Sequence, residues 1–247
     1  MPCFSMKIAG KTACIHALFD STPHYFRPYL TEEMPDFSVT VTETDLRFEQ
    51  VELDREAREE GFRRREFTGH FLERAAIQRA FAEFLFDHDI LLFHGSTVAV
   101  DGRAYLFAAK SGTGKSTHTR LWRQLFRERA VMINDDKPFL RLTDTAVEAF
   151  GSPWSGKHGL DTNIFAPLAG ICILERGAEN EIRPISAVEA LPVLRRQAYI
   201  PQDARKAHRV TALMEALADR VPLWHMTCNR EPGAAQVAYD AMSGLRR

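Results

Sequence analysis

A nine-residue run at positions 109–117 constrains the fold of this chain more than any other stretch. It reads Ala-Lys-Ser-Gly-Thr-Gly-Lys-Ser-Thr. It nearly matches the pattern G-x-x-x-x-G-K-[ST], in which backbone N–H groups surround a polyphosphate and the lysine reaches its outer oxygens. One position departs from the pattern, because Ala109 stands where the first glycine belongs.

The residues on either side of this run predict a strand before it and a helix after it. Residues 105–108 are apolar, and Leu121, Trp122, Leu125 and Phe126 recur at helical spacing. A loop between a strand and a helix N-terminus is a site at which phosphate groups bind. We therefore expect nucleotide binding by the following residues: Ser111, Gly112, Thr113, Gly114, Lys115, Ser116 and Thr117.

A pair of aspartates follows the next apolar segment. Residues 131–133 lead directly into Asn134, Asp135 and Asp136, and one helix with a tight return fills the interval from Lys115. This places the pair at the tip of the next strand. One carboxylate there can hold Mg²⁺ against the phosphates, and a second can take the proton of an attacking hydroxyl group. A solvated Asp-Asp turn is the structural alternative.

Together these motifs resemble a known family. His94-Gly95 at a strand end, the run Ser-Gly-x-Gly-Lys-Ser-Thr at 111–117 and the paired aspartates look like the catalytic domain of the bacterial HPr kinase/phosphorylase. The same core is similar to that of ATP-dependent phosphoenolpyruvate carboxykinase. The resemblance covers residues 90–175 and implies an α/β fold, in which a mixed sheet carries the phosphate loop and helices flank it. It also implies that His94 sits beside the catalytic acid.

The resemblance implies an ATP- and Mg²⁺-dependent kinase that transfers the γ-phosphate to a serine or another hydroxyl group. Ser116 and Asp136 would hold Mg²⁺, Lys115 and the loop backbone would bind the phosphates, and Asp135 would be the base. Which aspartate performs which task stays open, as does GTP or pyrophosphate as donor. The segment that meets HPr in that family has no match here, so the expected acceptor is another protein, a peptide or a small molecule.

A second loop, residues 151–159, reads Gly-Ser-Pro-Trp-Ser-Gly-Lys-His-Gly. It is too apolar and too basic for a plain linker, and functional groups often lie on such loops. We expect it to face the active site, with Lys157 at the transferring phosphate and Trp154 as a wall or base contact. The alternative is a packed surface loop with Trp154 as its plug.

The N-terminal part of the chain has a different character. Residues 1–50 mix short apolar runs with turn formers, which predicts a small β-rich lobe. Residues 52–65 are densely charged and indicate a solvated, charge-paired segment, whereas 69–86 has the apolar spacing of a helix. We expect residues 1–88 to form this lobe with its helix and residues 89–247 to form the catalytic domain.

Strand and helix patterns continue to the end of the chain. Asp101-Gly102 predicts a two-residue hairpin turn, Ser186 with Glu189 three residues on predicts a capped helix, and Pro232 opens the last helix. We expect strand 181–185 to pair as an edge with strand 170–175. The other expected strands are 138–142, 146–150 and 221–226, and the expected helices are 187–197, 204–219 and 232–242.

Composition excludes several classes of function. The net charge is −1, from 32 basic and 33 acidic residues, so nothing indicates a nucleic-acid or anionic-membrane partner. The four cysteines lack metal-ligand spacing and are expected to be reduced core thiols, and His16 and His24 are not expected to be ligands. No apolar run approaches the ~18 residues of a membrane span. We expect a cytoplasmic protein, and a homo-oligomer stays open.

Two other functions use the same motifs. A carboxykinase would employ the loop and the paired acids, but it also needs arginines for oxaloacetate and further metal ligands. A nucleotide-binding sensor or regulatory module would bind ATP without transferring phosphate. The sequence alone leaves both open.

Overall fold

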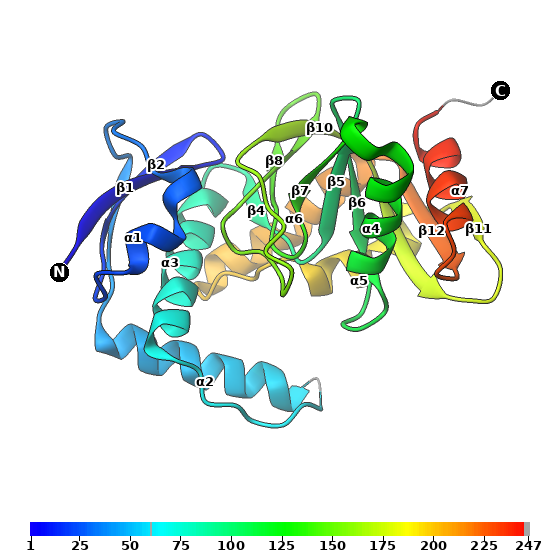
Figure 1. The fold of residues 1–247 in the computed structure, drawn as a ribbon. Coiled ribbons are helices and arrows are strands. Elements are labelled where there is room, and N and C mark those ends of the chain that lie inside the picture. Colours follow the sequence, from blue (N-terminus) through cyan, green and yellow to red (C-terminus); the bar gives the residue numbers. More distant parts are fainter. Residues whose placement is uncertain (60, 245–247) are drawn as a thin grey trace. The chain divides into compact units, whose positions relative to one another are not determined.

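The computed structural model describes residues 1–59 and 61–244 and divides into two compact units, Met1–Leu85 and Phe86–Arg247 (Figure 1). The first unit contains a small sheet of order β1-β2-β3, in which β1 and β2 are antiparallel and β2 and β3 are parallel. Its elements are β1 (Cys3–Ile8), β2 (Lys11–His16), α1 (Thr22–Tyr25), η1 (Arg27–Tyr29), β3 (Phe37–Thr40), α2 (Glu43–Glu59) and α3 (Gly69–Phe86). A small N-terminal sheet and the helix at 69–86 are confirmed.

The solvated, charge-paired character expected for residues 52–65 is confirmed by the ion pairs of Arg55 with Glu52 and of Arg64 with Asp54, and the first part of this segment belongs to helix α2. Thr42 and Asp45 begin it with reciprocal bonds, Thr42 N to Asp45 Oδ2 at 2.9 Å and Asp45 N to Thr42 Oγ1 at 3.4 Å. Arg79 of α3 donates to Glu49 Oε1 at 2.5 Å and to Asp45 Oδ1 at 3.1 Å. Because α2 is tied to α3 by charged groups, its sequence lacks a broad apolar stripe.

The second unit is built on a mixed sheet, which in the described residues has nine strands. The strand order is β4-β8-β9-β10-β6-β5-β7, and β12 joins the far half of β10. Its strands are β4 (Ile90–Leu92), β5 (Ser96–Val100), β6 (Arg103–Ala108), β7 (Ala130–Asn134), β8 (Phe139–Leu142), β9 (Val147–Phe150), β10 (Phe165–Arg176), β11 (Glu181–Pro184) and β12 (Leu223–Cys228). Its helices are α4 (Lys115–Phe126), η2 (Arg127–Arg129), α5 (Ala187–Gln197), α6 (Ala204–Arg220) and α7 (Gly233–Met242).

Most of the elements expected from the sequence are confirmed, and one strand pairing is wrong. The hairpin at Asp101-Gly102 has positive φ at both residues, 50° and 76°, and the capping box of Ser186 and Glu189 is formed. Strand β11, however, pairs with β12 and not with β10. Strand β12, which comes later in the chain, pairs with both β10 and β11 and so separates them.

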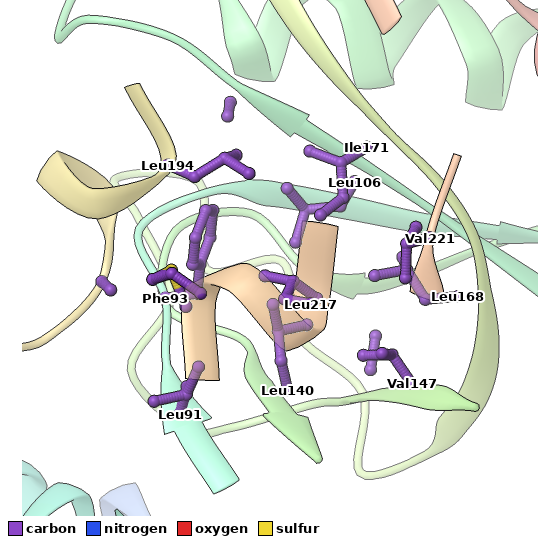
Figure 2. Packing of buried hydrophobic residues seen from close by; sticks show 14 of the residues in the cluster. Leu91, Phe93, Leu106, Leu140, Val147, Leu168, Ile171, Leu194, Leu217 and Val221 are labelled. Carbon is purple, nitrogen blue, oxygen red and sulfur yellow. The ribbon is translucent and has the colours of Figure 1, made fainter. Parts of the chain in front are cut away.

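Helices cover both faces of the sheet, which explains why strand β6 is buried at every position from Ala104 to Ala108. Leu106 and Ala108 belong to a core cluster with Leu194 of α5 and Leu217 of α6, whereas Phe107 belongs to a second cluster with residues of α4 and α7. Figure 2 shows the first cluster, with Leu106 near Ile171 and the side chains of Leu194 and Leu217. Successive residues of a strand point to opposite faces, so a strand covered on both faces is apolar at every position.

The cysteines are free thiols, but only Cys172 is a core thiol. Cys3 is exposed, and Cys14 and Cys228 are half-buried, so the expectation of core thiols is wrong for these three. Among the helices of the described residues, none has both the length and the apolar character that crossing a membrane requires.

Candidate active site

The three segments that carry the candidate site residues meet at one edge of the second unit's sheet. β5 is antiparallel to both β6 and β7, so its first residue lies beside the last residues of its two neighbours. Accordingly Ser96 pairs with Phe107, and Thr97 pairs with Asn134. His94 precedes β5, the glycine-bearing loop follows β6, and the aspartates follow β7. The strand order therefore brings all three to the same edge.

The loop at 109–114 joins β6 to α4, which confirms the predicted order of strand, loop and helix. Gly112 and Gly114 have φ values of 75° and 126°, a region that glycine tolerates. No side chain of a described residue caps the N-terminus of α4. The first N–H groups of α4 are therefore not bonded by a side-chain cap within the described residues.

The environment of Ala109 explains why alanine can stand where the pattern has glycine. The residue is 1% exposed, belongs to the core cluster beneath α4 and is not among the residues with positive φ. A methyl group at this position therefore contributes apolar packing without backbone strain. Glycine's conformational freedom is not needed at 109.

Two cations hold the loop through its carbonyl groups. Lys115 is buried, and its Nζ donates to Ala109 O at 3.2 Å. Arg176, the last residue of β10, donates from Nε to Thr113 O at 3.1 Å and from Nη2 to Gly112 O at 2.5 Å. Sequence reasoning missed Arg176, because a single arginine at a strand end carries no local signal.

Asn134 shapes the turn that carries the acid pair. Its Oδ1 accepts from the N–H groups of Asp136 at 2.7 Å and Lys137 at 2.5 Å, while its Nδ2 donates to Ser152 O at 2.8 Å. Asn134 and Ser152 are fully buried. The chain thus leaves the strand at Asn134, and the alternation of a strand does not govern the directions of Asp135 and Asp136.

Asp136 contacts His94. His94 Nε2 lies 3.1 Å from Asp136 Oδ1. Burial lowers the pKa of His94 despite the favourable bond to Asp136, so the imidazole is neutral at pH 7 and donates to the carboxylate. The pKa of Asp136 is lowered in turn, because the bond from His94 and the charges of Lys137 and Lys115 outweigh the opposing effect of burial.

The carboxyl group of Asp135 has a different environment from that of Asp136. Its Oδ1 accepts from the N–H of Gly156 at 2.6 Å, whereas its Oδ2 is buried and has no hydrogen-bond partner in the described part of the chain. Burial raises the pKa of Asp135, and repulsion by Asp136 adds to this. A Cβ at Gly156 would lie 3.2 Å from Oδ2, so glycine permits the close approach. Two adjacent carboxyl groups are thereby driven apart in proton affinity.

The loop at 151–159 reaches the acid pair through Gly156, and its two singled-out side chains lie in different environments. Trp154 is buried with its ring 6.3 Å from that of Phe139, which matches the packed plug and not a wall or base contact. Lys157 is exposed, and among the described residues it forms no hydrogen bond or ion pair with the rest of the site. A Cβ at Gly151 would lie 1.9 Å from Thr162 O, so this glycine is required by a close backbone approach.

No family model and no curated protein matches the chain. Among solved structures it is similar to the Hpr(Ser) kinase/phosphatase from Coxiella burnetii, with 9% sequence identity and a TM-score of 0.36. That alignment covers 62% of this chain and 99% of the other.

Proposed function

We propose that the chain is an ATP- and Mg²⁺-dependent kinase that transfers the γ-phosphate to a serine or another hydroxyl group. The observation that carries this proposal is Asp135 Oδ2, a buried carboxylate oxygen without a partner in the described residues. It lies at the sheet edge that also bears the glycine loop and the uncapped start of α4. An unsatisfied buried acceptor costs about 1 to 3 kcal/mol, which a folded protein retains where the group has a task.

The phosphates would bind at residues 111–117. The N–H groups of the loop and of the first turn of α4 supply donors, and the helix dipole favours the negative charge. An ammonium group has three donor hydrogens, so Lys115 can keep its bond to Ala109 O while it reaches a phosphate oxygen.

The residues at this edge also fit a magnesium ion. Mg²⁺ takes oxygen ligands and usually binds through one or two carboxylates together with substrate phosphates. Asp136, which is held ionised, and Ser116 in the first turn of α4 would hold it. Bound there, the ion would neutralise charge on the phosphates. His94 would fix the orientation of Asp136 through the bond to Oδ1.

Asp135 would act as the base. The acceptor hydroxyl oxygen attacks the γ-phosphorus, the bond from that phosphorus to the bridging oxygen of ADP breaks, and the hydroxyl proton passes to Asp135 Oδ2. Gly156 keeps Oδ1 occupied, so only Oδ2 is available for this proton. Lys157, which is exposed on the adjoining loop, would meet the transferring phosphate.

The test is a phosphate-transfer screen against serine-containing peptides and free hydroxy amino acids. Asp135→Asn keeps the size of the side chain and removes its capacity to accept a proton, so transfer should fall about 10²- to 10⁴-fold while Mg·ATP affinity is retained. Asp144→Asn, the same change at an exposed turn residue, is the matched control. If the wild type binds Mg·ATP tightly but labels no acceptor, and Asp135→Asn changes nothing, the chain is a nucleotide-binding sensor and the kinase proposal is wrong.

A further inference from the structure

The small sheet of the first unit brings together three side chains of the types that bind metals, Cys3, Cys14 and His16. Cys3 in β1 pairs directly with His16 in β2, and Cys14 stands two residues before His16. Directly opposed residues point to the same side of a sheet, as do residues two apart in one strand. All three side chains therefore share one face, while Met6 and Ile15 occupy the buried face.

The donor atoms of these side chains lie at coordination distances from one another. Cys3 Sγ is 3.4 Å from Cys14 Sγ, Cys14 Sγ is 3.7 Å from His16 Nε2, and the three donor atoms all lie within 4.8 Å of one another. With Zn–S bonds of about 2.3 Å and Zn–N bonds of about 2.0 Å, tetrahedral ligands lie about 3.5 to 3.8 Å apart. The two separations from Cys14 Sγ, 3.4 and 3.7 Å, are close to that spacing, and the third, within 4.8 Å, reaches it by a rotation of the side chains.

The hairpin makes this geometry a property of the backbone. Ala9 and Gly10 have φ values of 50° and 80°, the conformation of a tight two-residue turn, which fixes the register of β1 against β2. Ligands on paired strands are held more firmly than ligands on loops. β1 is also the edge of its sheet, and a cation bound across β1 and β2 would fasten that edge.

We propose that Cys3, Cys14 and His16 bind a zinc ion on the open face of this sheet. Two thiolates and an imidazole are the ligands that zinc prefers, and none of the three offers the oxygen that magnesium or calcium requires. Two thiolate charges balance the charge of Zn²⁺, and the fourth coordination position is taken by water. The site is in the first unit and is independent of the kinase proposal.

The three residues also bear on the alternative of a disulfide bond. Cys3 and Cys14 are diagonal neighbours, since Cys3 opposes His16 and Cys14 opposes Ser5. Diagonal positions are separated by about 7 to 8 Å between Cα atoms, at or beyond the limit that a disulfide spans without movement of the strands. A disulfide also leaves unexplained why His16 Nε2 lies against Cys14 Sγ.

The experiment uses the full chain, purified with a reductant and stripped of metal by chelation. Zn²⁺ is titrated against a chromophoric chelator, and Co²⁺ replaces it in a second series to show thiolate-to-metal charge-transfer absorption. The wild type should bind one Zn²⁺ tightly. Cys3→Ser, Cys14→Ser and His16→Ala should each weaken binding by at least about 100-fold, since even changes to residues around a metal site cost about 10- to 100-fold.

Cys228→Ser is the matched control, because it removes a half-buried thiol of the other unit by the same substitution. It should leave the zinc affinity unchanged. Circular dichroism checks that each variant is folded, and the exposed position of Cys3 makes Cys3→Ser the mildest of them. Equal zinc affinities in the wild type and Cys3→Ser would overturn the proposal, and so would a Cys3–Cys14 disulfide that forms in the presence of Zn²⁺.

Discussion

The glycine loop and the turn that carries the acid pair lie at the same edge of the large sheet, and they are built in different ways. The loop at 109–114 has positive φ at two glycines, and its carbonyl groups accept bonds from Lys115 and Arg176. The turn at 134–137 and the start of the loop at 151–159 are held together by a buried side-chain network, in which Asn134 and Ser152 are fully buried.

The proposed function assigns these two segments different chemical duties. A loop that receives a polyphosphate must leave its N–H donors unused, so its own stability comes from contacts to its acceptors. Acid groups that take a proton or hold a metal must stay within a narrow range of positions, and this requires a rigid support. Substitutions in the first loop should therefore affect ligand affinity, and substitutions in the second should affect folding.

The largest effect is expected for Lys115→Ala. It removes a charge-assisted contact to the phosphates in a partly desolvated site, which should cost on the order of 2 to 5 kcal/mol of ATP-binding free energy. Titration calorimetry with Mg·ATP measures the change, and Lys110→Ala, an exposed lysine of the same loop, is the control. Equal affinities in wild type and Lys115→Ala would show that the loop does not bind phosphates.

Asn134→Ala should act on stability. It leaves the N–H groups of Asp136 and Lys137 and the carbonyl of Ser152 without their partners, at about 1 to 3 kcal/mol for each group that stays buried. We expect a loss of about 3 kcal/mol in the free energy of unfolding. Urea denaturation followed by tryptophan fluorescence reports on this unit, because Trp122, Trp154 and Trp224 all belong to it.

The control for this variant is Asn180→Ala. Asn180 is half-buried, and its Oδ1 accepts one bond, from Asn229 N at 3.0 Å. Its loss should cost about 1 kcal/mol. If Asn134→Ala is no more destabilising than Asn180→Ala, the buried network of Asn134 and Ser152 is not a rigid support for the acid pair.

A third prediction concerns pH and the helix behind the first loop. Burial lowers the pKa of His118 to about 4, and its Nε2 accepts from Trp122 Nε1 at 3.1 Å. The unfolded chain binds a proton near pH 6.5 and the folded chain does not, so this contribution is complete above pH 6.5 and is lost as the pH falls toward 4. At pH 5 the wild type should have lost about 2 kcal/mol from this group.

His118→Gln retains an acceptor for Trp122 and does not titrate. The difference in unfolding free energy between wild type and His118→Gln should therefore shrink or reverse between pH 7 and pH 5, while other groups cancel in the comparison. A difference that is constant over this range would contradict the burial of a neutral His118.

The smallest effect is expected for Arg176→Ala. Its two bonds to loop carbonyls are exposed and hold the loop in place before the ligand arrives, which is worth about 1 kcal/mol. Mg·ATP affinity should fall about fivefold, with little change in the free energy of unfolding. Arg183→Ala, which breaks an exposed ion pair with Glu189, is the control. A larger effect on unfolding than on ATP affinity would place Arg176 among the structural residues.

The sequence alone was sufficient for the features that depend on neighbours along the chain. The helices at 69–86 and 187–197, the Asp101-Gly102 hairpin and the order of strand, loop and helix around 109–117 are all as predicted. Periodicity, capping and turn chemistry act over a few residues, so they can be read directly from the letters. The sequence did not predict that the charged segment at 43–59 forms helix α2, because the contacts that stabilise this helix are made with Arg79 in another helix.

Only the tertiary structure decided which of these pieces come together. The contact of His94 with Asp136, the bond from Gly156 to Asp135 and the hold of Arg176 on the loop all depend on which strands become neighbours. The same holds for Cys3, Cys14 and His16, whose spacing in the sequence gives no metal-site signal until the hairpin register sets them on one face. Strand order and register arise from packing over the whole sheet, and a local pattern carries no record of them.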